Sequence, residues 1–106
     1  MLQTFKKLFS TSPSPNYLQL VKEGAVILDV RSRGEFSQGS IKGSINIGVN
    51  ELNSNLHRLK DKSQPIITCC ASGMRSASAK NILKSKGYTA VYNGGSWTGL
   101  QTIITT

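Results

Sequence analysis

Acidic residues are scarce in this chain and absent after residue 61. The 106-residue sequence carries five Asp and Glu against 13 Lys and Arg, which gives a net charge of +8. Such an imbalance favours anionic partners, whether a small anion, a nucleic acid or an acidic membrane surface. The length suffices for one globular domain and is too short for two.

Cysteine and histidine, the usual zinc ligands, are almost missing. The two cysteines, Cys69 and Cys70, are adjacent, and His57 is the one histidine. Three residues cannot supply the four ligands of a structural zinc site, so we expect no metal. The spacing also excludes a disulfide framework and a Cys-x-x-Cys redox pair.

Long apolar runs are missing as well. No run approaches the length that crosses a membrane, and residues 1–9 lack a secretory apolar stretch. We therefore expect a reduced, cytoplasmic protein with no membrane partner. Residues 1–13 are predicted to form a short N-terminal arm, and residues 14–106 the domain.

Strand-like and helix-like segments alternate along the chain. Short apolar runs predict strands at 25–30, 44–47, 65–70 and 90–92. Helical spacing or capping signals predict helices that begin at Ser14-Pro15 and end at Gly24, and helices over 49–60, 76–86 and 96–104, with a turn at Gly94-Gly95. This alternation is typical of an α/β fold with a parallel sheet.

The segment after the strand at 65–70 carries the most distinctive chemistry. It reads Cys70-Ala-Ser-Gly-Met-Arg-Ser76 and runs into the next predicted helix. Small residues let backbone N–H groups turn inward as an anion-binding nest, and Arg75 adds a full charge. A thiol at the mouth of this nest should have a lowered pKa, so Cys70 is predicted to be a thiolate nucleophile.

Other candidate residues are assigned by their place on the strands. Strand alternation directs Cys69 away from Cys70, into the core. Asp29 and Arg31, at the end of an apolar strand, are predicted to brace the sheet rather than to catalyse. Arg33, just beyond them, is predicted to border the pocket of the reactive segment.

These residues resemble a known family, the rhodanese-like sulfurtransferases. The loop at Cys70 looks like the family's Cys-x-x-Gly-x-Arg-Ser pattern. Three further segments resemble family motifs in the same order: Asp29-Val-Arg31 with Glu35-Phe36, the stretch 39–47, and Val91-Tyr-Asn-Gly-Gly95 with Trp97. Together the four motifs cover about residues 14–100.

The resemblance implies a rhodanese-like fold, with a central parallel sheet of about five strands and helices on both sides. It also implies a reaction without a cofactor, in which Cys70 takes sulfane sulfur from a small anionic donor such as thiosulfate. The resulting persulfide would be held by the amides of the loop, and cyanide, a small thiol or a protein thiol would accept the sulfur. The implied substrate-binding residues are Ala71, Ser72, Gly73, Met74, Arg75 and Ser76.

Three alternatives remain open from the sequence. Counted from Cys69, the loop reads Cys-x5-Arg-Ser, the pattern of tyrosine phosphatases and of related arsenate reductases. The second alternative is that the domain acts as a non-enzymatic sulfur carrier or binding module. The third alternative is nucleic-acid binding, which the positive charges of Lys80, Lys84 and Lys86 suggest. No aromatic residues lie among these lysines, so we expect no nucleic-acid partner.

Overall fold

The computed structural model describes residues 15–105, in which strands and helices alternate. The strands are β1 (Val26–Asp29), β2 (Ile45–Asn46), β3 (Ile66–Cys70) and β4 (Val91–Ser96). The α-helices are α2 (Tyr17–Lys22), α3 (Arg33–Ser37), α4 (Met74–Ser85) and α5 (Trp97–Ile104), and η1 (Val49–Arg58) is a 3-10 helical segment. The predicted arm at 1–13 lies outside the described residues.

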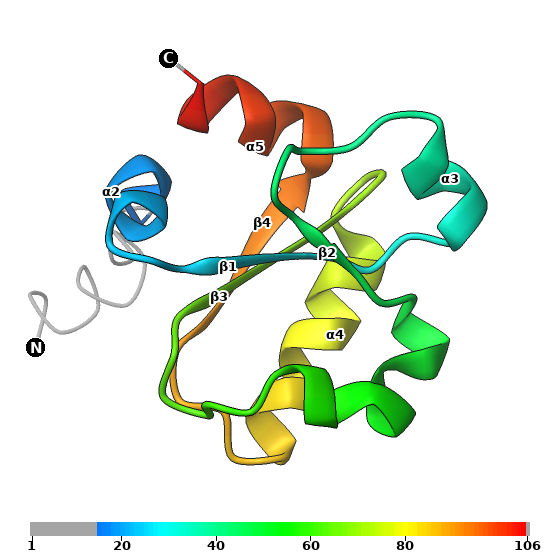
Figure 1. Ribbon diagram of the computed structural model, residues 1–106, viewed down its shortest axis with the longest axis vertical. Coiled ribbons are helices and arrows are strands. Elements are labelled where there is room, and N and C mark those ends of the chain that lie inside the picture. The colour runs from blue at the N-terminus through cyan, green and yellow to red at the C-terminus, as the bar shows by residue number, and fades with distance from the viewer. Residues whose placement is uncertain (1–14, 106) are drawn as a thin grey trace, which may run out of the picture.

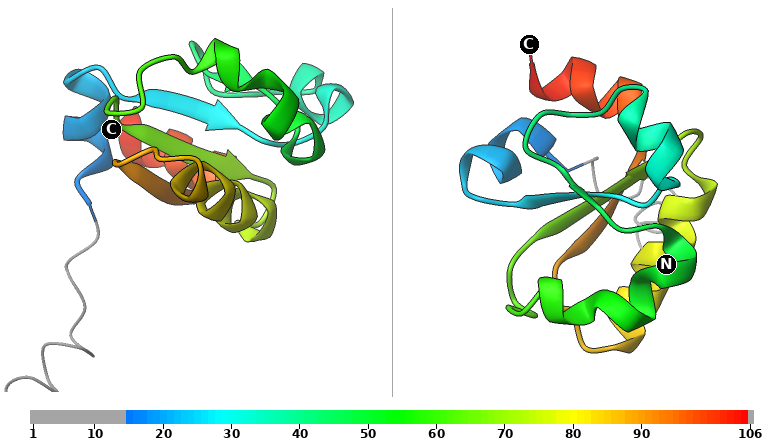
Figure 2. Two further views of the ribbon diagram at one scale, coloured as in Figure 1. Left: turned by 90° about the horizontal axis from the view of Figure 1, so that it is seen from below. Right: turned by 45° about the vertical axis from the view of Figure 1, so that its right-hand side comes forward.

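The strands form one parallel sheet in the order β2-β1-β3-β4 (Figure 1). Helices cover both faces: α4 and η1 pack on one, and α2 and α5 on the other (Figure 2). The predicted α/β class with a parallel sheet is confirmed. The described residues contain four strands rather than about five, because the chain has four apolar runs and each forms one strand.

Side chains of the central strands alternate between two buried clusters. Leu28 and Cys70 belong to the cluster that includes Leu83 of α4. Cys69 belongs to the opposite cluster, with Leu100 of α5. Both faces of the central strands are therefore covered, which explains why their sequences read as continuous apolar runs. Full burial of each leucine contributes about 2 kcal/mol.

Two helices begin at residues other than those predicted. α2 begins at Tyr17 because the Asn16 side chain accepts the Gln19 amide, 3.0 Å away, so the cap lies downstream of Pro15 and not at Ser14. Ser14 is outside the described residues. α4 begins at Met74, two residues before the predicted start, because the Gly73 carbonyl already accepts the amide of Ala77 at 3.1 Å.

Two further expectations are corrected by local interactions. The segment predicted as an amphipathic helix over 49–60 is 3-10 helical and breaks at Asn55, whose side chain donates to the Glu51 carbonyl at 2.8 Å. The predicted turn at Gly94-Gly95 belongs to β4. A Cβ at Gly94 would lie 2.8 Å from Ile67 Cγ2, so only glycine lets the strands approach this closely.

Helix α3 was not predicted, although the sequence carried its signal. Ser32 and Glu35 form a reciprocal capping box, in which each side chain accepts the other residue's backbone amide. The predicted closing helix is confirmed as α5, which Ser96 caps. Among the described residues, no helix combines the length and apolar character needed to cross a membrane.

A buried ion pair closes the carboxyl end of β1. The Arg31 guanidinium donates to the Asp29 carboxylate at 2.7 Å, and the two side chains are 5% and 0% exposed. Arg31 also donates to the backbone carbonyls of Glu35 and Gly39, at 3.2 and 2.7 Å. The pair thus ties α3 and the loop after it to the end of the strand.

We expect Asp29→Asn to lower the free energy of unfolding by about 3–5 kcal/mol, because it leaves a buried guanidinium without its counter-charge. Urea denaturation measures this change. Glu51→Gln is the matched control, since it also removes one negative charge but at an exposed position. Equal, small effects of both substitutions would contradict the structural importance of the pair.

Candidate active site

The predicted reactive segment lies where a buried strand meets a helix. Cys70 is the last residue of β3, Gly73 is the cap of α4, and Arg75 and Ser76 lie in the first turn of that helix. In open parallel sheets, ligands bind beyond the carboxyl ends of the strands, and this junction lies at that edge. The fold therefore places the segment where a binding site is expected.

Backbone amides of the loop donate to the Cys70 sulfur. The Gly73 amide donates to Sγ at 3.0 Å and the Ser76 amide at 3.4 Å, while the Ser76 hydroxyl lies 3.5 Å away. Gly73 has a φ of +102°, which favours glycine and turns its amide toward the sulfur. The Cys70 side chain is 0% exposed, so the thiol lies beneath the loop rather than at its mouth.

These contacts determine the acidity of the thiol. Burial acts to raise the pKa of Cys70, but hydrogen bonds from the Ser76 side chain and from the amides of Ser76, Ser72 and Gly73 lower it below its ordinary value of 9.0. The site therefore stabilises a thiolate by donors that point at one sulfur atom. This is the geometry of a nucleophile prepared for attack.

Cys69 has the opposite environment. Its side chain is fully buried against the other face of the sheet, and burial raises the pKa of its thiol to about 12, with the nearby Asp29 carboxylate acting in the same direction. Within residues 15–105, none of the amide hydrogen bonds that converge on Cys70 reaches the Cys69 sulfur. The two adjacent cysteines thus lie in opposite environments, which raise the pKa of Cys69 and lower that of Cys70.

Sequence reasoning missed Asn93, which organises the loop from β4. Its Oδ1 accepts from the Ser76 hydroxyl at 2.6 Å and from the Gly95 amide at 2.9 Å, and its Nδ2 donates to the Gly73 carbonyl at 3.2 Å. One amide side chain thereby fixes Gly73 and Ser76, two of the residues that donate to the Cys70 sulfur. Asn93 lies within the motif Val91-Tyr-Asn-Gly-Gly95, but no role was predicted for it, and the glycine pair after it was predicted to form a turn.

Arg75 is held by a residue from another part of the chain. Its guanidinium forms a bidentate pair with the Glu35 carboxylate, at 2.6 and 2.9 Å. Hydrogen bonds from Arg75 are the main cause that lowers the pKa of Glu35 to about 2. Arg75, predicted to bind the anionic substrate, therefore has its charge opposed by a carboxylate that lies 40 residues earlier in the sequence.

The remaining predicted residues are divided between surface and interior. Ala71, Ser72 and Met74 are exposed, and Met74 has 78% of its surface accessible. Asp29 and Arg31 form the buried ion pair at the end of β1. The His, Cys, Asp and Glu side chains of residues 15–105 form no group of three that would hold a metal ion.

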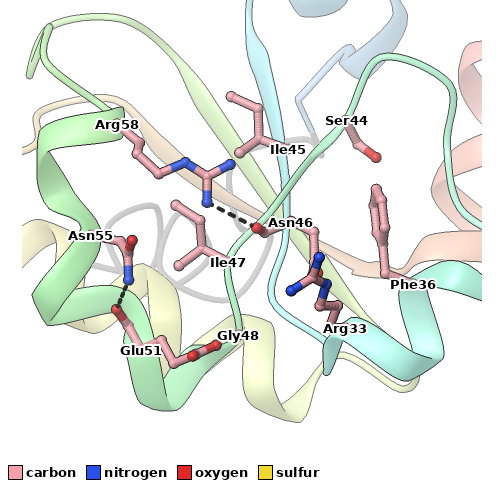
Figure 3. Close-up of a pocket in the computed structure, with 10 residues that line it drawn as sticks. All are labelled: Arg33, Phe36, Ser44, Ile45, Asn46, Ile47, Gly48, Glu51, Asn55 and Arg58. Atoms are coloured by element: carbon pink, nitrogen blue, oxygen red, sulfur yellow. Dashed lines mark hydrogen bonds between the residues drawn. The ribbon is translucent and has the colours of Figure 1, made fainter.

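Two hollows lie near this edge of the sheet, and Arg75 is the one residue of the loop that lines either of them. The smaller has a volume of about 260 Å³ and is lined by Arg75 and by Val30 at the end of β1. The larger, of about 640 Å³, lies between α3, β2 and η1 (Figure 3). Arg33, which was predicted to border a pocket, lines both hollows.

Comparison with known proteins identifies the family. A model of the rhodanese-like domain matches residues 14–101. The chain belongs to the rhodanese-like domain family. Its solved relatives include the human single-domain sulfurtransferase TSTD1, with a TM-score of 0.72 and 30% identity over 84% of this chain and 95% of that one.

Curated relatives of this rhodanese-like domain include two proteins of Escherichia coli strain K12. The uncharacterized protein YibN is 39% identical over 75 residues, which cover 67% of this chain and 51% of YibN. The chain thus spans about half the length of that relative. Thiosulfate sulfurtransferase PspE is 35% identical over 69 residues, or 64% of this chain and 66% of PspE.

The two thiols of the rhodanese-like domain should differ in their alkylation by iodoacetamide. We expect Cys70 to react with a midpoint pH below 9.0, because its lowered pKa keeps the thiolate present until the pH falls through that value. Cys69 should stay unreacted in the folded protein. Peptide mass spectrometry across pH separates the two sites, and a higher midpoint for Cys70 would contradict the assignment.

Asn93→Ala should raise the midpoint pH of Cys70 alkylation, because the Ser76 hydroxyl and the Gly73 backbone lose the side chain that positions them. Asn81→Ala, an exposed asparagine on α4, is the matched control. The free energy of unfolding is measured for both variants, since a purely structural role for Asn93 would lower stability and leave the midpoint of the folded protein unchanged.

Proposed function

We propose that this rhodanese-like domain is a sulfurtransferase that carries sulfane sulfur as a persulfide on Cys70. The Cys70 thiolate attacks the outer sulfur of thiosulfate or of another persulfide donor. A new S–S bond forms to Cys70, the S–S bond of thiosulfate breaks, and sulfite leaves with the electron pair. A thiophilic acceptor, cyanide or a thiol, then takes the outer sulfur and regenerates the Cys70 thiolate.

The observation that carries this proposal is the set of donors around one sulfur atom. The amides of Gly73 and Ser76 and the Ser76 hydroxyl all lie within 3.5 Å of Cys70 Sγ. They stabilise negative charge on the thiolate before attack, and the same loop would stabilise the anionic persulfide afterwards. Relatives named thiosulfate sulfurtransferase, such as PspE, support thiosulfate as a donor.

The charge of the chain supports an anionic donor. The net charge is +8, and no acid lies in residues 62–106, which contain the loop and α4. A positive field raises the local concentration of a dianion such as thiosulfate and speeds its arrival. The reaction needs a free thiol, so the proposal includes a reducing compartment, the cytoplasm.

A sulfur carrier for a partner protein is the second candidate, and the exposure of Met74 favours it. This apolar side chain stands on the reactive loop with 78% of its surface accessible, where a protein acceptor would contact it. Slow turnover with thiosulfate and fast transfer from a persulfide protein would distinguish a carrier from a thiosulfate enzyme. The Cys-x5-Arg alternative has less support, because Cys69 faces the opposite core cluster and has a raised pKa.

Treatment with thiosulfate should add the mass of one sulfur atom to the Cys70 peptide. We expect the gain to disappear in Cys70→Ser and to persist in Cys69→Ser, because only the Cys70 sulfur receives the loop amides. Mass spectrometry under non-reducing conditions measures the product. Loading of Cys69, or no loading of the wild-type protein, would overturn the proposal.

A further inference from the structure

The larger hollow is a cavity whose lining residues take no part in the proposed persulfide chemistry. It has a volume of about 640 Å³, and none of the loop residues 70–76 lines it. Figure 3 shows Arg33 and Arg58 reaching toward β2 from opposite sides, one from the start of α3 and the other from the end of η1. Two elements far apart in the sequence thus direct guanidinium groups into one cavity.

These two arginines keep hydrogen-bonding capacity for a ligand. Arg58 donates one long hydrogen bond to the Asn46 carbonyl, at 3.3 Å. Within the described part of the chain, Arg33 forms no ion pair, in contrast to Arg75, which Glu35 holds in a bidentate pair. Glu51 is the only carboxylate that lines the cavity, so the cavity carries a net positive charge.

Three apolar side chains contribute to the wall of the cavity, among residues that are mostly polar or charged. Phe36, Ile45 and Ile47 are the apolar side chains among its lining residues (Figure 3). Thiosulfate and cyanide have no apolar part that would contact these side chains. The combination instead suits an organic molecule with an apolar body and an anionic group, and the volume lies within the range of about 300–1,000 Å³ typical of small-molecule sites.

The cavity lies next to the smaller hollow, with which it shares lining residues. Arg33, Gly48 and Glu51 line both this cavity and the smaller hollow. The smaller hollow reaches Arg75 on α4 and Val30, and Val30 belongs to the same buried cluster as Cys70. The two hollows therefore lie side by side, and the smaller one has the reactive-loop residue Arg75 in its lining.

We propose that this cavity binds the carboxylate end of the sulfur acceptor, a thiol of short-peptide size with an apolar body. The inference rests on the proposed function. The acceptor's thiol loses its proton to solvent, and the thiolate attacks the outer sulfur of the Cys70 persulfide. A new S–S bond forms on the acceptor, the persulfide S–S bond breaks, and Cys70 leaves as a thiolate. Arg33 and Arg58 bind the acceptor's carboxylate.

The test follows only the second step of the proposed reaction, in which sulfur passes from the Cys70 persulfide to the acceptor. Protein loaded with thiosulfate and freed of excess donor is mixed with acetyl-Cys-Leu, with its C-terminal amide, or with cyanide, and loss of persulfide is followed by mass spectrometry. The two dipeptides differ only in the carboxylate charge. We expect the wild-type protein to react faster with the acid than with the amide.

Substitution of the two arginines should abolish that preference. For acetyl-Cys-Leu, we expect the second-order rate constant to fall about threefold in Arg33→Gln or Arg58→Gln and about tenfold in the double variant, typical of partly exposed charge pairs. The rates with the amide and with cyanide should change little. Arg33→Lys and Arg58→Lys should retain most of the preference because they keep the charge.

Lys84→Gln is the matched control, since it removes one positive charge from an exposed position on α4. Equal losses for the acid and the amide, an equal loss in Lys84→Gln, or no preference in the wild-type protein would overturn the inference while persulfide loading still supports the proposed function. Failure of the wild-type protein to load sulfur would overturn both. Urea denaturation of each variant separates a folding defect from lost binding.

Discussion

The buried Asp29–Arg31 ion pair is the interaction on which the rest of this structure depends. Burying two charges is costly unless their hydrogen bonds are satisfied, and here they are. Arg31 contacts both Asp29 carboxylate oxygens and two backbone carbonyls, and its guanidinium lies 4.6 Å from the centre of the Trp97 ring. One guanidinium therefore joins the end of β1, helix α3, the loop after it and the start of α5.

That pair is linked to the reactive thiol through Glu35. The Glu35 carbonyl accepts from Arg31, while its carboxylate holds Arg75 in the first turn of α4. The same turn presents the Ser76 amide and hydroxyl to Cys70, and Asn93 fixes Ser76 from the other side. The donors of residues 72–76 can lower the pKa of a buried thiol only if that segment is rigidly placed, and Asn93 of β4 and Glu35 of α3 hold it. The distant ion pair contributes to that rigidity.

Much of this arrangement was predictable from local pattern. Buried strands of a parallel sheet read as apolar runs, so the four strands and the α/β class followed from the sequence. Strand alternation likewise separated Cys69 from Cys70. Errors arose where one side chain competes with the regular pattern: Asn16 moved a helix start, and Asn55 broke the segment at 49–60. Helix α3 was not predicted, even though Ser32 and Glu35 form its capping box.

The sequence by itself determined the order of the elements, the family motifs and the nucleophile candidate, because each depends on residues close together in the chain. Only the tertiary structure decided which distant groups meet. It paired Arg75 with Glu35 and placed Asn93 against Ser76. It also opened a cavity between Arg33 and Arg58. Such contacts depend on how the helices pack against the sheet, and local spacing carries no record of that packing.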